Sequence, residues 1–390
     1  MNFPSDPIDL YDDDVILNPW PHYARLRDLG PVVWMEALGN YAFTQYDAVR
    51  YGLRDHETYI SSLGAAADEY DCTHQRGNTV ASDQPRHTKL RGAILPPLLR
   101  DNVETLRPHI QSVADDIAAA CVRKGSFEAI TDLAQTLPLT VVRDLIGLPD
   151  FGLENMLKWA SAAFDMQGIQ NARGQAARPV IAQMKDFIAK EVRPETLKLG
   201  SWSHRITEMA ARGEIDPEIV HFAIRDYINP SLDTTISAIG HFIFHAGSNS
   251  DTWQKLRDDP SLALNAAHEA IRIGTPIRSF SRHTSENVEL GGHLIPKGAR
   301  VMMLYASANR DESVFSQADQ FDIGRRNARR HLAFGAGIHM CAGMHLALLE
   351  IECLILSMTQ QMAKIKIDKP TVAMNNSICA FSKLNVRILI

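Results

Sequence analysis

The sequence has 390 residues, of which 45% are hydrophobic and 22% are charged. A chain of this length and composition can bury a large apolar core, which excludes a disordered protein and a small disulfide-stapled scaffold. Its 40 Lys and Arg residues and 46 Asp and Glu residues give a net charge of -6, so no overall basic field is present to bind nucleic acid or an anionic membrane.

The N-terminus, MNFPSDPIDLYDDD, lacks the basic start and apolar run of a secretory signal. No window holds 18 uninterrupted apolar residues, and the most apolar stretch, from Leu346 to Met358, contains Glu350 and Glu352. The five cysteines, at positions 72, 121, 341, 353 and 379, form no CxxC pair, which argues against a disulfide framework and a four-thiolate zinc site. We therefore expect a cytoplasmic protein that does not cross a membrane.

The first expected elements are a short helix over 21–29 and a hairpin in which residues 32–34 pair with residues 41–43. Residues 60–82 show no clear periodicity, so we expect a functional loop that covers a pocket. From about residue 85 to residue 275, apolar residues recur at three- and four-residue spacing. This pattern predicts helices over 103–122, 130–146, 176–192 and 218–246.

Beyond residue 275 the pattern changes to short strands, an irregular basic loop at 309–333 and one more helix over 342–362. The predicted fold class is mainly α with a smaller β part (α+β). We expect one domain over residues 1–390. Its β-rich part covers about 30–60, 277–305 and 364–390, and its helical part covers about 84–275 and 342–362.

The strongest local signal is the segment HLAFGAGIHMCAGMHLALLEIE around Cys341. Gly335 and Gly337 permit tight turns and the close approach of a flat ligand. A thiolate at a helix start is stabilised by free backbone amides and the helix dipole. A buried structural cysteine beside a glycine turn would show the same local pattern.

This segment resembles the heme-binding signature of the cytochrome P450 monooxygenases, FGxGxHxCxG, which reads FGAGIHMCAG in this chain. Three further matches are the ExxR pair of Glu269 and Arg272, the HxxxR pair of His87 and Arg91, and Arg282. The resemblance covers essentially the whole chain. It implies the cytochrome P450 fold, with the heme between the long central helix and the helix after the cysteine loop.

The resemblance also implies a role for each matched residue. Cys341 is expected to be the axial ligand, and therefore the metal ligand, of heme b (iron protoporphyrin IX). Other expected cofactor-binding residues are His87, Arg91, Arg282, His339, Phe334, Gly335 and Gly343, and Glu269 and Arg272 are expected to form a structural ion pair. Because a thiolate on heme iron favours cleavage of the O–O bond, the expected activity is insertion of one atom of O2 into a C–H bond.

The run Pro230-Ser231-Leu232-Asp233-Thr234-Thr235 resembles the family's acid–threonine motif, so Asp233 and Thr234 are the expected catalytic proton relay. A threonine inside a helix can instead donate its hydroxyl to a carbonyl one turn earlier. Relatives commonly carry Ala-Gly where this chain carries Pro230-Ser231. A proline there removes one N–H and clashes with the carbonyl of Asp226, which predicts a bend in the helix.

The segments VELGG, ASANRD and NNSICAFSKLNVRI look like bacterial members that oxidise small para-substituted aromatic acids. The first expected reaction is therefore hydroxylation or O-demethylation of a benzoate-like acid. An ionised Asp226 would repel such an acid, whereas Arg76 or Arg278 could pair with it. The alternatives are a neutral hydroxylated or methoxy substrate, or a heme-binding protein without turnover. The expected substrate-pocket residues are Phe164, Asp226, Asn229, Leu232, Ile277, Arg278 and Phe280.

No part of the 390 residues reads as a flavin or iron–sulfur domain, so the resemblance implies electron supply by a ferredoxin and a ferredoxin reductase. It also implies a monomer. Four arginines, Arg325, Arg326, Arg329 and Arg330, precede the cysteine loop and could attract an acidic ferredoxin. A charge run of this kind is also typical of a solvated loop.

Overall fold

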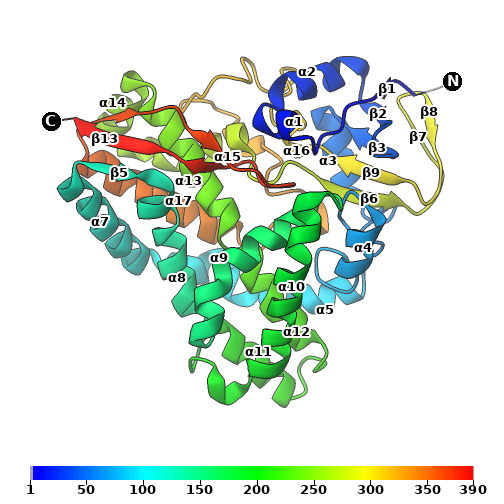
Figure 1. Ribbon diagram of the computed structural model, residues 1–390, viewed down its shortest axis with the longest axis horizontal. Helices are drawn as coiled ribbons and strands as arrows, with labels where there is room; N and C mark the ends of the chain where they lie inside the picture. Colours follow the sequence, from blue (N-terminus) through cyan, green and yellow to red (C-terminus); the bar gives the residue numbers. More distant parts are fainter. Residues whose placement is uncertain (1–2, 390) are drawn as a thin grey trace.

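A computed structural model describes residues 3–389 and shows a chain dominated by helices, as the sequence predicts (Figure 1). The helices are α1 (Asp13–Leu17), α2 (Trp20–Leu29), α3 (Tyr46–Arg54), α4 (Glu69–Gln75), α5 (Arg86–Ile94), α6 (Arg100–Glu104), α7 (Arg107–Lys124), α8 (Thr136–Ile146), α9 (Asp150–Asp165), α10 (Ala172–Glu191), α11 (Trp202–Ala211), α12 (Ile219–Ile228), α13 (Asp233–Gly247), α14 (Ser250–Asp258), α15 (Ala263–Gly274), α16 (Tyr305–Ala308) and α17 (Met344–Gln361). The strands are β1 (Ser5–Asp6), β2 (Val32–Met35), β3 (Asn40–Phe43), β4 (Tyr59–Ile60), β5 (Ser126–Glu128), β6 (Phe280–Thr284), β7 (Val288–Leu290), β8 (His293–Ile295), β9 (Arg300–Met303), β10 (Lys364–Ile367), β11 (Thr371–Val372), β12 (Phe381–Lys383) and β13 (Asn385–Leu389).

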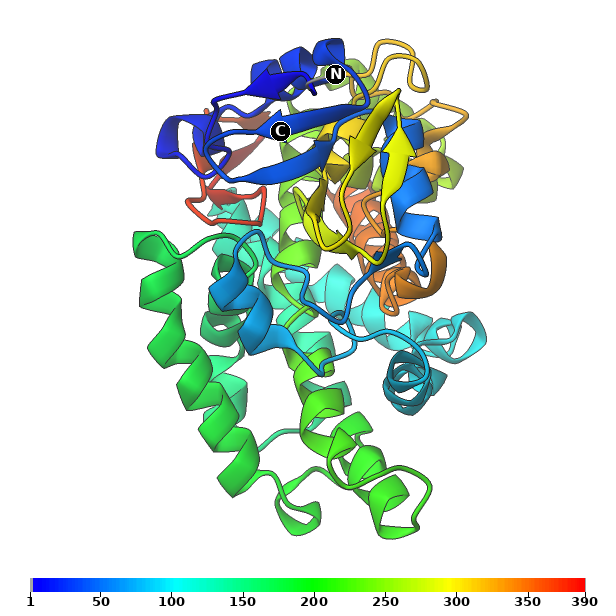
Figure 2. The same cartoon turned by 90° about the vertical axis from the view of Figure 1, so that its right-hand side faces the viewer.

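The main sheet has six strands in the order β1-β2-β3-β9-β6-β4. In the β2–β3 hairpin, Val32 lies opposite Phe43 and Trp34 lies opposite Tyr41, which confirms the pairing expected from the sequence. Strand β9 then joins β3 in parallel. Figure 2 shows these strands gathered at one end of the molecule, while the green helices of the middle of the chain extend toward the other end.

The C-terminal strands do not extend this sheet. Strand β13 is the middle strand of a three-stranded antiparallel sheet and pairs with β10 on one side and with β5 on the other. Strand β5 lies inside the stretch predicted to be helical. Ile365 and Val386 from these strands are buried in the apolar core of the helices, so the three-stranded sheet covers the helical part of the molecule. The strands are therefore divided between separate sheets, with β13 at the far left of Figure 1.

The helix predicted over 218–246 is two helices, α12 and α13, separated by residues 229–232. The prediction of one continuous, bent helix is wrong because Pro230 has no N–H and crowds the carbonyl one turn before it. Two hydroxyls satisfy carbonyls that the break leaves free. Ser231 Oγ donates to Ile228 O at 3.1 Å, and Thr234 Oγ1 donates to Pro230 O at 3.0 Å.

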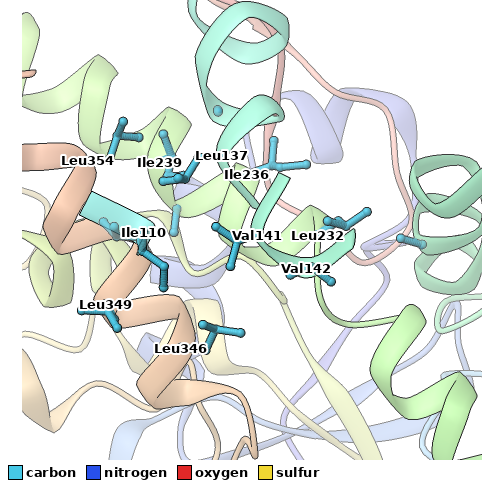
Figure 3. Packing of buried hydrophobic residues seen from close by; sticks show 14 of the residues in the cluster. Ile110, Leu137, Val141, Val142, Leu232, Ile236, Ile239, Leu346, Leu349 and Leu354 are labelled. Atoms are coloured by element: carbon cyan, nitrogen blue, oxygen red, sulfur yellow. The ribbon is translucent and has the colours of Figure 1, made fainter. Parts of the chain in front are cut away.

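The core is centred on α13, which packs against α17 and α15. Figure 3 shows Ile236 and Ile239 of α13 among apolar side chains of α8 and α17, including Val141 and Leu354. Burial of each such side chain contributes about 1.5–3 kcal/mol, so the relative position of α13 and α17 is strongly held. Within residues 3–389, no helix is long and apolar enough to cross a membrane.

Candidate active site

A large cavity lies beside α13, α17 and the cysteine loop, which comprises residues 334–343. It holds about 1800 Å³ of atom-free space, including its open mouth. Its walls come from α5, α9, α12, β6 and the segment before α5 as well. Segments more than 200 residues apart in the sequence therefore meet around one space.

Cys341 has the only thiol exposed among the five cysteines, and it lines this cavity. The carbonyl of Phe334 accepts a hydrogen bond from the Cys341 amide at 2.8 Å, which closes the loop. Burial raises the pKa of the thiol, whereas the backbone amides of Gly343 and Met344 and the charge of Arg91 act to lower it. These groups would stabilise a thiolate that faces the cavity.

The turn before Cys341 requires glycine at a specific position. Gly337 has φ of +71°, and a Cβ atom there would lie 2.6 Å from the carbonyl oxygen of Leu53. Any larger residue at position 337 would therefore be strained and would also clash with the backbone at the end of α3. Gly335 also has φ of +71°, but a Cβ there would meet only ordinary contacts.

Four basic groups expected to bind the cofactor come together from three parts of the chain. Arg91, Arg282 and His339 line the cavity, and the His87 ring lies 4.3 Å from the His339 ring between centroids. The Nε2 atoms of both histidines are buried without a partner among the described residues. Burial lowers the pKa of His87 to about 4 and that of His339 to about 2, with nearby arginines adding to the effect. Acidic groups of a ligand would find donors here.

The Glu269–Arg272 pair lies outside the cavity in a fully buried network. Arg272 donates from Nε to Glu269 Oε2 at 2.7 Å and from Nη2 to Glu269 Oε1 at 2.8 Å. It also donates to the carbonyls of Asn309 and Ala318 at 2.8 and 2.7 Å. This geometry is that of the structural ion pair predicted from the sequence.

Arg325 belongs to the same network, which corrects its expected place in an exposed basic run. Its Nε donates to Glu269 Oε1 at 3.0 Å, and its side chain is 6% exposed. A buried carboxylate attracts a second guanidinium because the low dielectric makes the attraction strong. Arg326, Arg329 and Arg330 are exposed, as the sequence predicts.

The two residues expected to form the proton relay are placed differently. Thr234 lines the cavity, and its hydroxyl donates to Pro230 O, the backbone bond that is the common alternative for a threonine in a helix. Asp233 is not part of the cavity wall. Burial and the neighbouring Asp165 carboxylate raise the pKa of Asp233 to about 7. Asp233 therefore has a pKa near neutrality, which suits a group that transfers protons, and it precedes the cavity-lining Thr234 in the chain.

Glu350 is an acidic group on the cavity that the sequence analysis did not single out. It lies on α17, is 1% exposed, and its Oε1 has no partner among the described residues. Burial raises the pKa of Glu350 to about 8. In the sequence, Glu350 is a charged residue inside an apolar helix. A charge at such a position indicates a buried carboxyl, and this was the signal that could have identified Glu350.

Five of the seven expected substrate-pocket residues line the cavity: Phe164, Asp226, Asn229, Ile277 and Phe280. Leu232 does not, because it is fully buried in the core, and Figure 3 shows it close to Val142 of α8. Arg278 does not either, because its Nη1 donates to the carbonyls of Asn375 and Asn376 at 2.8 and 3.3 Å. Arg76 is outside the cavity as well and pairs with Glu69 at 2.9 Å.

Comparison with known proteins agrees with the sequence signature. A family model described as cytochrome P450 matches residues 226–376. Cytochrome p450 CYP199A2 of Rhodopseudomonas palustris is 32% identical over 386 residues, which cover 98% of this chain and 93% of that protein. This chain belongs to the cytochrome P450 family. Cytochrome P450 107B1 of Saccharopolyspora erythraea is 28% identical over 360 residues, with 88% of this chain and 87% of that protein covered.

Solved structures show the same fold. Full-length CYP116B46 from Tepidiphilus thermophilus has a TM-score of 0.88 at 22% identity, over 98% of this P450 chain and 53% of that chain. The CYP116B5 heme domain of Acinetobacter radioresistens has a TM-score of 0.87 at 22% identity, over 98% and 97% of the two chains. The expected cytochrome P450 fold is confirmed.

This P450 is a heme-thiolate monooxygenase, and its cofactor is heme b. The residues present fit that group. The cavity combines one thiol facing inward with an apolar lining and basic side chains whose donors have no carboxylate partner. A flat, largely apolar ring with two carboxylates matches these features.

Proposed function

We propose that this P450 oxidises a C–H bond of a small aromatic substrate held in the cavity, with Cys341 as the axial ligand of the heme. The observation that supports this assignment is the single cavity-facing thiol with two backbone amides beside it. When bound, heme supplies activation of O2 for insertion of one oxygen atom into a C–H bond.

The remaining roles belong to the chain. His87, Arg91, Arg282 and His339 would bind the two propionates, because they supply hydrogen-bond donors beside the cavity. Phe334, Gly335 and Gly343 would shape the loop that presents the thiolate. We assign the delivery of protons into the cavity to Thr234, which lines it. The adjacent, buried Asp233 would exchange protons with Thr234.

The pocket lining supports an aromatic substrate. The side chains of Phe164, Ile277, Phe280, Trp202 and Tyr227 line the cavity. Rings and branched aliphatic groups of this kind exclude water and favour flat apolar ligands. Hydroxylation or O-demethylation of a benzoate-like acid was the first expectation. The acidic Asp226 on the wall favours the alternative, a substrate without a carboxylate.

Electrons would come from a ferredoxin, itself reduced by a ferredoxin reductase. Arg326, Arg329 and Arg330 are exposed and have no ion pair among residues 3–389, so their charge is free to attract an acidic protein.

We also propose that residues 1–390 form one domain, with residues 1–2 and 390 outside the described part. Its support is an apolar core of the helices that runs from Leu90 to Val386, and a main sheet in which the N-terminal strand β3 pairs with β9.

The absorption spectrum of the dithionite-reduced holoenzyme with carbon monoxide tests the assignment of Cys341. A strongly red-shifted Soret band is expected for thiolate ligation, and Cys341→Ser should abolish it. Cys121→Ala is the matched control, because Cys121 is buried in α7 away from the cavity, and it should keep the band. If Cys341→Ser keeps the red-shifted band, the assignment of the ligand is wrong.

A further inference from the structure

One part of the cavity wall is polar and acidic. Asp226, in the last turn of α12, lines the cavity together with Asn229, just after that helix, and Thr79, in the segment before α5. Thr79 Oγ1 donates a hydrogen bond to Asp226 Oδ2. Asn229 Oδ1 is buried and has no donor among the described residues. A carboxylate and an amide oxygen without a donor therefore lie side by side on this wall.

Within residues 3–389 no basic side chain lies within ion-pair distance of the Asp226 carboxylate, although the more distant charges of Arg225 and Arg91 act to lower its pKa. Arg225 precedes it in α12, but its guanidinium lies over the ring of Phe222, 5.5 Å from the centroid. Arg91 donates its Nη2 to Met340 O at 2.5 Å. A partly desolvated carboxylate without a cation in contact is costly, and a bound cation would remove that cost.

Two other cations that could favour an acidic ligand, Arg76 and Arg278, are not part of the cavity wall. Arg76 pairs with Glu69, and Arg278 donates to backbone carbonyls outside the cavity. Arg91 and Arg282 line the cavity, but they are the groups assigned to the heme propionates. The wall around Asp226 therefore offers negative charge and no free positive charge to a substrate.

We propose that Asp226, with Thr79 and Asn229 beside it, binds an ammonium group of the substrate, so that the substrate is a small aromatic amine in its protonated form. The aromatic side chains of Phe164, Trp202 and Tyr227 line the same cavity and would contact the ring and the cation. This inference rests on the proposed function, because it names the substrate class of the same pocket. Asp226 is then a specificity-determining residue.

Calorimetric titration of the ferric holoenzyme with three matched ligands tests the proposal. The ligands are para-methoxy-dimethylbenzylamine, para-methoxybenzyl alcohol and para-methoxybenzoate, which share a ring and differ in charge. At about pH 7.5 the amine is a cation and the benzoate is an anion. The expected order of affinity is amine, then alcohol, then benzoate. Tightest binding of the benzoate or of the alcohol by the wild type would overturn the proposal.

The charge itself is tested with Asp226→Asn, which keeps the shape of the side chain. This variant should bind the amine about tenfold more weakly or worse and the benzoate more tightly, with little change for the alcohol. Glu218→Gln is the matched control, because this exposed residue precedes α12 and lies outside the cavity wall. An equal loss of amine affinity in Glu218→Gln would show a long-range charge effect and contradict a contact at Asp226.

The Thr79→Val variant distinguishes the effect of the Asp226 charge from the effect of the contact between Thr79 and α12. It removes the hydroxyl bonded to Asp226 but keeps the carboxylate, so the preference for the amine should persist. If Thr79→Val loses amine binding as Asp226→Asn does, loop position rather than charge is the cause, and the proposal fails. These outcomes leave the monooxygenase assignment untouched, because that assignment depends on the carbon monoxide spectrum and on product formation.

Discussion

Arg325 Nε donates to Glu269 Oε1 at 3.0 Å, so the arginine that precedes the cysteine loop shares a carboxylate with Arg272. The backbone amide of Asp322 donates to the same oxygen at 3.0 Å. One buried carboxylate thereby connects α15 to the segment that leads into the cysteine loop. Two guanidinium groups depend on it for charge compensation.

Glu269→Gln is expected to destabilise the holoenzyme by about 3–5 kcal/mol, because it leaves two buried guanidiniums without a counter-charge. Urea denaturation monitored by heme absorption and by tryptophan fluorescence measures this change. Glu208→Gln is the matched control, because this exposed residue contacts Arg212 at the surface, and its change should stay below about 1 kcal/mol. Equal stability of the Glu269→Gln and Glu208→Gln variants would show that the network contributes little.

Thr234→Ala is expected to lower the product formed per electron pair supplied by about tenfold, because the hydroxyl on the cavity wall can no longer pass a proton. Electron consumption should continue and hydrogen peroxide should accumulate. Thr234→Ser should restore most of the coupling because it returns a hydroxyl. Measurement of product, peroxide and oxidised electron donor decides the matter, and normal coupling in Thr234→Ala rules out the relay role.

Glu350→Gln is expected to change the pH dependence of stability. Burial raises the Glu350 pKa from 4.5 to about 8, so the folded protein holds a proton that the unfolded chain releases. This contribution is fully favourable below about pH 4.5 and is lost as pH rises toward 8, at about 1.4 kcal/mol per pH unit. The glutamine variant should remove this slope and be more stable than wild type near neutral pH.

Urea denaturation of the holoenzyme at several values between about pH 6 and pH 8 measures the slope. Glu352→Gln serves as the control, since Glu352 is on the same helix but pairs with Arg107 at 2.9 Å. An unchanged slope in Glu350→Gln would mean that Glu350 titrates as an ordinary carboxyl.

Reversal of charge at Arg326 and Arg330 is expected to slow reduction by ferredoxin about tenfold at low salt and to flatten its dependence on salt. These exposed arginines precede the cysteine loop, so their field would guide an acidic partner toward the heme. Stopped-flow reduction measures the rate. The control reverses Lys158 and Lys190, which are exposed on α9 and α10. Equal rates in both double variants would locate the docking surface elsewhere.

The sequence by itself determined the family and predicted which residues would bind the cofactor. The cysteine loop is a contiguous signature, and the spacing of Glu269 and Arg272 places them on one helix face whatever surrounds them. Such features depend on neighbours along the chain, so a linear pattern records them. The β2–β3 hairpin was predictable for the same reason, since its register follows from a short turn.

Only the tertiary structure decided which polar groups face the cavity and which find partners elsewhere. The local sequence around Arg325 predicts an exposed charge. Its partner Glu269 is 56 residues away along the chain, so only the folded structure shows the pair. Asp226 and Leu232 are six residues apart in one segment, yet Asp226 lies on the pocket wall and Leu232 in the core, because the packing of α12 and α13 against other helices decides which faces are covered. Side-chain direction and long-range pairing depend on packing between distant segments, which no local pattern contains.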